Sequence, residues 1–305
     1  MSGALADPGE INKNLKAYVL LTFTAGCWGA NVILGKLAVG EISPMLLVSL
    51  RWLSVLILLV LFARKHLVRD WPVLRNHLVF VGLMGTVGFT SFNALFYMAA
   101  HSTSAINIGI LQGSIPVFVL LGTFLLYRSR ITRLQACGVA VTLIGVIIVA
   151  SGGDLAQLQS LSINRGDFFI LLACFFYAAY SIGLSRRPAV SALGLFTALA
   201  FVAFIVSLPL LAIEVNATGF RLPSLTGWVV VALVALLPSL VAQISFIHSV
   251  SLIGPARAGV FINLVPVFAS IMAVVFLRES FEYFHALALG LVLGGIWLSE
   301  VGKVK

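Results

Sequence analysis

Ten apolar runs, each about 20 residues long, constrain the fold of this chain more than any other feature of its sequence. A run of that length spans the hydrocarbon core of a bilayer as an α-helix. Only helices and closed barrels satisfy every backbone polar group there, and unbroken apolar runs lack the alternation of a barrel strand. The runs cover residues 17–35, 43–63, 78–98, 103–127, 134–151, 167–184, 190–213, 227–250, 256–277 and 284–301. The sequence therefore predicts an all-α integral membrane protein with ten transmembrane helices.

The composition indicates a membrane protein, and the cysteines do not indicate a metal site. Of the 305 residues, 61% are hydrophobic and 10% are charged, whereas soluble domains carry about 25% charged residues. Lys13 and Lys16 precede the first run, but the run is too long for a signal-peptide core and no cleavage site follows. We therefore expect a retained helix. Cys27, Cys137 and Cys174 stand singly in different runs, which indicates neither a disulfide framework nor a metal site.

The basic residues are distributed unevenly between the two sides of the predicted membrane. If the N-terminus is cytoplasmic, four basic residues lie on outer segments, namely Lys36, Arg165, Arg221 and Arg278. Fourteen lie on inner segments: Lys13, Lys16, Arg64, Lys65, Arg69, Arg75, Arg128, Arg130, Arg133, Arg186, Arg187, Arg257, Lys303 and Lys305. The positive-inside rule then places both termini in the cytoplasm. The net charge of +9 orients the protein in the membrane and does not indicate a nucleic-acid partner.

An internal repeat relates the two halves of the chain. Residues 91–148 align without a gap on residues 241–298. Each half contains five runs, an odd number, so the second half must enter the membrane from the opposite side. We therefore expect two inverted five-helix repeats, 16–151 and 166–302, around a central cavity, as in many secondary transporters. The identical pairs are Phe96/Phe246, Gly109/Gly259, Pro116/Pro266, Val117/Val267, Phe118/Phe268, Arg128/Arg278, Ala136/Ala286, Leu143/Leu293 and Gly145/Gly295.

Two of the repeated residues are prolines inside apolar runs. Pro116 and Pro266 lack the N–H that an α-helix needs, so we expect their helices to bend near Gln112 and Ile262. With the glycines of the same runs they are candidate hinge or gating residues: Gly109, Pro116, Gly259 and Pro266. The alternative is a fixed kink, which is common at transmembrane prolines.

Amide and aromatic side chains recur inside the runs and form the candidate substrate site. Offsets of 149 or 150 pair Trp28 with Tyr177 and Asn93 with Gln243. Such groups could hydrogen-bond a zwitterion and stack on a ring, or could equally join helices to one another. We interpret His248 as a hydrogen-bonding core histidine more readily than as a proton relay. The candidate substrate-binding residues are Trp28, Asn31, Asn93, Tyr97, Gln112, Tyr177, Tyr180, Gln243, His248 and Asn263.

Charged groups are nearly absent from the interiors of the runs. Arg51 is the exception, and it could attract a substrate carboxylate or pair with backbone carbonyls and helix ends. No Asp or Glu lies in the interior of a run, although ion-coupled carriers commonly use a buried carboxylate. This absence favours facilitated diffusion, and a histidine-coupled proton cycle is the alternative.

Several segments resemble the ten-helix EamA-like branch of the drug/metabolite transporter superfamily. They are CWGANVILGK in the first run, SLRWLSVL in the second, FNALFYMAAHSTSAINIGILQGSIPVFVLLGTFLL across the third and fourth, and LVPVFASIMAVVFLRESFEYFHALALGLVLGGIWL in the last two. Within this branch the chain looks most like bacterial aromatic amino acid and paraquat exporters. One departure is that Glu279 follows Arg278 whereas Ser129 follows Arg128, so only the second half keeps the acidic residue of the family.

The resemblance implies a monomeric exporter in a bacterial inner membrane. Its substrates would be aromatic and other neutral amino acids, and also related metabolites or toxic organic cations. It implies contacts with membrane lipids and no cofactor. A membrane enzyme is a weaker alternative, because the chain contains no HExxH or GxSxG motif and no pair of intramembrane aspartates. A channel or receptor is the other alternative, and the inverted repeat favours a carrier over both.

Overall fold

The computed structural model describes residues 8–128, 131–154 and 164–302, and every regular element in these ranges is helical. The helices are α1 (Pro8–Leu37), α2 (Pro44–Leu74), α3 (Leu78–Met84), α4 (Phe92–Ala100), α5 (Ala105–Leu111), α6 (Ile115–Tyr127), α7 (Arg133–Ala150), α9 (Arg165–Gly183), α10 (Ala192–Thr218), α11 (Leu225–Val234), α12 (Ala242–Ile253), α13 (Pro255–Val260), α14 (Val265–Leu277) and α15 (Tyr283–Val301).

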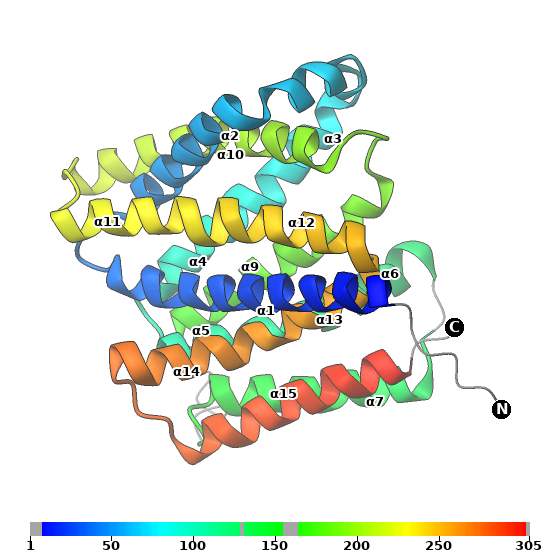
Figure 1. Cartoon of the computed structure of the whole chain (residues 1–305). Coiled ribbons are helices and arrows are strands. Elements are labelled where there is room, and N and C mark those ends of the chain that lie inside the picture. The colour runs from blue at the N-terminus through cyan, green and yellow to red at the C-terminus, as the bar shows by residue number, and fades with distance from the viewer. Residues whose placement is uncertain (1–7, 129–130, 155–163, 303–305) are drawn as a thin grey trace.

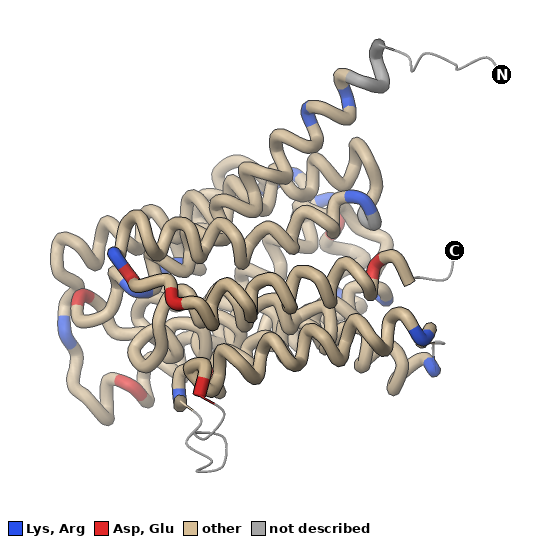
Figure 2. Tube along the Cα trace, turned by 90° about the horizontal axis from the view of Figure 1, so that it is seen from below, with Lys and Arg blue, Asp and Glu red and all other residues tan. Residues whose placement is uncertain are grey.

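The described part of the chain contains nine helical stretches that are long and apolar enough to cross a membrane. Their number differs from the ten predicted runs because the runs 43–63 and 78–98 lie in one stretch, Pro44–Ala100, of 57 residues. The backbone leaves the helical region inside this stretch at His77, with φ −124° and ψ 29°. The charged residues gather at the two ends of the helices, with a largely uncharged middle between them (Figure 2). This distribution suits a membrane-spanning protein.

The helices are interrupted at corresponding positions in the two halves. Single π-helical turns occupy Gly85–Ser91 and Ala235–Val241, which are 150 residues apart. Short 3-10 turns at Gln112–Ser114 and Phe261–Leu264 precede α6 and α14, each of which carries proline in its first turn. The two 3-10 turns lie where Pro116 and Pro266 predict a bend.

The physical cause of these 3-10 turns is the missing proline N–H. Pro116 cannot donate to the carbonyl of Gln112, and the N–H of Ile115 donates to that carbonyl instead. In the second half the N–H of Val265 donates to the carbonyl of Ile262 in the same way. Each helix therefore tightens for one turn and then continues.

The large helix–helix contacts join the first half of the chain to the second. α1 packs against α12 and α14, and α9 packs against α4 and α6. α2 pairs with α10, and α7 lies beside α15 (Figure 1). At Gly138 a Cβ atom would lie 2.5 Å from the carbonyl oxygen of Gly295, so α7 and α15 approach closely only because both residues lack a side chain.

Two ends of the helix bundle can be distinguished in Figure 1. At one end, called the near end, α1 begins and α15 ends. At the other, called the far end, α1 ends and α15 begins. These names locate the features of the site.

Candidate functional site

A cavity of about 490 Å³ lies between the two halves of the protein. Helices from both halves line it. Eight of the ten candidate substrate-binding residues lie on its wall, together with Arg51: Trp28, Asn31, Asn93, Gln112, Tyr177, Tyr180, Gln243 and Asn263. Pro116, Gly259 and Pro266 of the candidate hinge residues also line it. A volume of this size accommodates a small metabolite.

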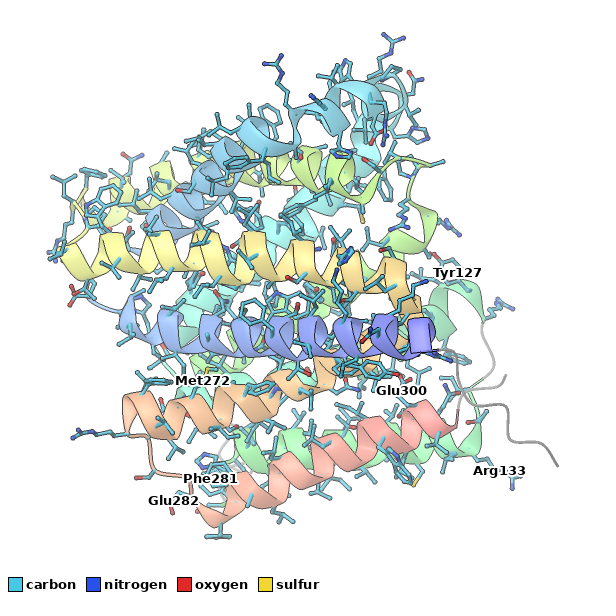
Figure 3. The ribbon with its side chains drawn as sticks, viewed as in Figure 1. Tyr127, Arg133, Met272, Phe281, Glu282 and Glu300 are labelled. Carbon is cyan, nitrogen blue, oxygen red and sulfur yellow. The ribbon has the colours of Figure 1, made fainter. Side chains whose placement is uncertain are left out.

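The cavity extends from the middle of the bundle to the near end. Its lining includes Gln135 in the first turn of α7, and Ser299 and Glu300 in the last turn of α15. Figure 3 shows Glu300 and Arg133 at the near end, and Phe281 and Glu282 at the far end. Glu300 is the one carboxylate among the described lining residues, and no described histidine lines the cavity.

Arg51 stands at the centre of a buried polar cluster. Its side chain is 6% exposed. Nε donates to Ser239 Oγ at 2.8 Å. Nη1 donates to Asn93 Oδ1 at 2.5 Å, to the Tyr97 hydroxyl at 2.7 Å and to Asn31 Oδ1 at 3.3 Å. The cluster therefore joins α1, α2 and α4 of the first half to the π-helical turn at Ala235–Val241 of the second.

The partners of Arg51 are themselves oriented by further hydrogen bonds. Asn93 Nδ2 donates to the Phe89 carbonyl at 2.6 Å, which turns Asn93 Oδ1 toward the guanidinium. Ser239 Oγ donates to the Val234 carbonyl at 2.6 Å and so presents a lone pair to Arg51 Nε. Both π-helical turns contribute here, because one contains Phe89 and the other contains Ser239. Such turns occur frequently at functional sites.

Aromatic rings form much of the remaining cavity wall. The rings of Trp52 and Phe89 stack, with centroids 4.6 Å apart and planes 5° apart. Phe89 also contacts Tyr180 at 5.5 Å, and Tyr177 contacts Tyr180 at 5.6 Å. From the other side, Trp28 Nε1 donates to the Pro238 carbonyl at 3.1 Å, which leaves its ring as the group available to a ligand. The wall can thus stack on a planar substrate.

The far end is closed by hydrogen bonds between segments that are distant in sequence. Lys36 Nζ donates to the carbonyls of Ala100 at 2.8 Å and Thr103 at 2.9 Å. The Thr103 hydroxyl donates to the carboxylate of Asp167. Across the halves, Glu279 accepts from the N–H groups of Ala105 at 2.8 Å and Ile106 at 3.0 Å. These bonds connect α1, α5, α9 and the loop after α14.

A second hollow, of about 600 Å³ and lined mainly by polar residues, opens at the far end. Its lining includes Lys36, Asn107, His101, Glu279 and His285. Desolvation and the nearby Lys36 ammonium lower the pKa of the His101 imidazole, and Glu214 partly opposes them. The imidazole is therefore neutral at pH 7. Within the described residues, no group of three or more His, Cys, Asp and Glu side chains could hold a metal ion.

Three candidate residues do not line the cavity. Tyr97 is 2% exposed and reaches the site only through its hydroxyl, which bonds to Arg51. Gly109 lies where a Cβ atom would be 2.7 Å from the Cβ of Ala269, so it serves the packing of α5 on α14. The expectation of a core histidine at His248 is wrong, because α12 turns this side chain to the exposed surface.

Several residues of the site do not appear among the candidates. Trp52, Phe89, Phe92 and Phe196 line the cavity, as does Ser239. The four aromatic residues look like lipid-facing residues in the sequence. The repeat offered one signal, since an offset of 150 places Phe89 on Ser239 and both lie at the Arg51 cluster.

Known proteins match this chain over most of its length. The profile of the EamA-like transporter family matches residues 15–151 and again residues 164–300. "Uncharacterized transporter YetK" of Bacillus subtilis (strain 168) is 27% identical over 96% of this chain and 89% of its own length. "Uncharacterized inner membrane transporter YedA" of Escherichia coli (strain K12) is 26% identical over 90% of this chain and 88% of its own.

A solved structure shares the fold. It is described as "Crystal structure of protein" and superposes with a TM-score of 0.61 at 19% identity, covering 92% of this chain and 94% of its own. At this identity the likeness concerns the fold alone.

Proposed function

Because the chain belongs to the EamA-like transporter family, we propose that it exports aromatic and other neutral amino acids by alternating access. The single observation that carries this proposal is the cavity of about 490 Å³ between the two halves. It is open toward the near end, closed at the far end, and lined by rings and amides. Rings supply stacking surface and amides supply hydrogen bonds to a charged backbone group, which are the two needs of an aromatic amino acid.

The proposed topology has ten crossings in two inverted repeats, 16–151 and 166–302. In it, Pro44–Ala100 crosses the membrane twice and turns at His77. The break in the backbone at His77 supports the turn, and the packing of α4 on α2 supports the return of the chain. The recurrence of π-helical turns at an offset of 150 and the double match to the family profile support the repeat.

The distribution of basic residues supports a cytoplasmic near end. The described conformation is then open to the cytoplasm. In a bacterial inner membrane this side receives the substrate, and the opposite conformation releases it. We propose that the 3-10 turns before Pro116 and Pro266 act as hinges, because they interrupt two cavity-lining helices at corresponding places.

The proposed transport is facilitative. Among the described lining residues Glu300 is the one carboxylate, and it lies in the last turn of α15, away from the central Arg51 cluster. The alternative is proton-coupled export, which would need a titrating group at the substrate site. His248 is exposed and His101 lies at the hollow of the far end, so neither supports a histidine-coupled cycle.

The test is transport by purified protein in liposomes. We expect counterflow of labelled phenylalanine and leucine that saturates with substrate and proceeds without a pH gradient. A membrane enzyme would convert the substrate, and a channel would pass it without saturation or counterflow. Accumulation against the substrate gradient, driven by a proton gradient alone, would contradict the facilitative mechanism.

A further inference from the structure

We infer that the cavity contains a carboxylate receptor at Arg51, and that it accepts organic acids and amino acids but rejects amines without a carboxylate. The inference rests on the proposed function for the role of the cavity, and it names the chemical class of the substrate. It also separates the two substrate classes that the family resemblance leaves open, since organic cations would be excluded.

The first observation is the hydrogen-bonding state of the guanidinium. Nε and Nη1 donate to four described residues: Ser239, Asn93, Tyr97 and Asn31. Nη2 donates to no residue in the described part of the chain. Since Arg51 lines the cavity, a molecule inside the cavity is what can accept from Nη2.

The second observation is the charge of the cluster. The four partners of Arg51 are neutral, and no carboxylate in the described part of the chain pairs with it. Arginine stays protonated in proteins, and an unpaired buried charge is unfavourable. At 6% exposure, Arg51 receives little compensation from bulk water. A substrate that carries a carboxylate into the cavity supplies the missing negative charge.

The third observation is that the guanidinium is held in place before any ligand arrives. Its Cζ atom lies 5.2 Å from the centre of the Trp52 ring, which in turn stacks on Phe89. The Tyr97 hydroxyl donates to Asn31 Oδ1 at 3.2 Å, which links two of the acceptors that hold Nη1. A fixed planar guanidinium matches a carboxylate better than a flexible ammonium does.

These observations also predict the orientation of an amino acid. The carboxylate would bind at Arg51, and the side chain would lie along the aromatic wall formed by Trp28, Phe92, Tyr177 and Tyr180. The ammonium contributes nothing at Arg51, because like charges repel there. An analogue without the ammonium should therefore still bind, whereas an analogue without the carboxylate should not.

Three ring-matched compounds test the inference on the purified protein. They are phenylalanine, 3-phenylpropionate, which keeps only the carboxylate, and phenethylamine, which keeps only the ammonium. Binding is measured by calorimetry and by the change in tryptophan fluorescence, to which the cavity-lining Trp28 and Trp52 contribute. We expect the first two compounds to bind and phenethylamine to bind at least about tenfold more weakly. Equal or tighter binding of phenethylamine would overturn the inference.

Variants of the receptor distinguish recognition from helix packing. Arg51→Gln should weaken 3-phenylpropionate binding at least about tenfold, and Arg51→Lys should keep part of the affinity. Arg69→Gln is the matched control, because Arg69 belongs to the same helix but its side chain is 65% exposed and pairs with Asp70. A folded Arg51→Gln protein that binds 3-phenylpropionate like the parent would overturn the inference. If Arg51→Gln does not fold, the comparison of the three compounds on the parent decides.

Failure of the inference can be told from failure of the proposed function. Suppose that 3-phenylpropionate binds but that neither phenylalanine nor leucine is transported in liposomes. This result would leave the receptor intact and contradict the proposed transport of amino acids. Transport of phenylalanine and leucine, together with binding of phenethylamine as tight as that of 3-phenylpropionate, would contradict the receptor and leave the proposed transport of amino acids intact. If leucine and 4-methylpentanoate, the aliphatic pair, also fail to bind, no carboxylate is recognised and the inference is wrong.

Discussion

Replacing Glu279 with glutamine should loosen the closed far end and shift the carrier toward the conformation that opens there. The Glu279 carboxylate accepts from the N–H groups of Ala105 and Ile106 at 2.8 and 3.0 Å. These are the first two N–H groups of α5, which have no acceptor within their own helix. Glu279 itself follows α14, so the contact holds the second half against the first.

The size of the effect follows from the chemistry of this contact. Loss of a capping side chain costs about 0.5–2 kcal/mol, and a negative charge at a helix N-terminus contributes about 0.3–1 kcal/mol. Glutamine keeps one acceptor oxygen and loses the charge, so about 1 kcal/mol should be lost. Since 1.4 kcal/mol is a factor of ten, the ratio of far-end-open to far-end-closed protein should rise about fivefold.

Thiol labelling from the far side measures this ratio. A single cysteine at position 112 would replace a cavity-lining glutamine, in a chain from which Cys27, Cys137 and Cys174 have been removed. A membrane-impermeant reagent added outside intact cells should label it about five times faster in the Glu279→Gln background.

The control is Glu282→Gln, three residues further along the same loop. The Glu282 N–H donates to His285 Nδ1 of its own helix, α15, at 3.0 Å, and the Glu282 side chain bonds to no segment of the first half among the described residues. It should leave the labelling rate unchanged. An unchanged rate in a folded Glu279→Gln protein would refute the reasoning, because the capping contact would then not bias the equilibrium.

Three further expectations concern the cavity wall, the topology and the packing. Trp28→Ala and Tyr177→Ala should each raise the apparent KM for phenylalanine several-fold, with less effect on alanine, because a ring contact contributes about 0.5–1.5 kcal/mol; equal effects on both substrates would place the rings outside the site. A reporter fused after Asn76 should face the cytoplasm if Pro44–Ala100 crosses twice, and a periplasmic signal would contradict this topology. Gly138→Ala should destabilise the protein by about 1–3 kcal/mol, seen as a lower melting temperature in detergent, because its Cβ meets α15 at 2.5 Å. Gly290→Ala, which has open space around its Cβ, should be nearly neutral, and equal melting temperatures would contradict the packing argument.

The parts of the fold that depend on local sequence could be predicted well. The apolar runs predict the helices, and Pro116 and Pro266 predict where two of them are interrupted. Thr24, Trp28 and Asn31 are spaced by four and three residues and so share one face of α1. In the structure this face points inward, because Thr24 Oγ1 bonds to the Ala242 carbonyl at 3.3 Å and the other two line the cavity.

The features that depend on contacts between distant segments could not be predicted. The partners of Arg51 come from three other segments, and the acceptor role of Glu279 depends on where the loop after α14 meets α5. His248 shows a second limit. The spacing of residues shows which of them share a face of a helix, but not which neighbour that face meets. The π-helical turn before α12 also rotates the faces of this helix relative to those of α11, and His248 lies on an exposed face.

The paired π-helical turns also set the direction in which the side chains that follow them point. A π-helical turn accommodates one residue more than an α-helical turn, and each residue of an α-helix rotates the chain by about 100°. Deleting a residue from Gly85–Ser91 would therefore turn Asn93 away from Arg51. The second half has the same extra residue at Ala235–Val241. Gln243 follows Val241 by two residues, as Asn93 follows Ser91, so the same deletion in the second half would turn Gln243 away from the cavity.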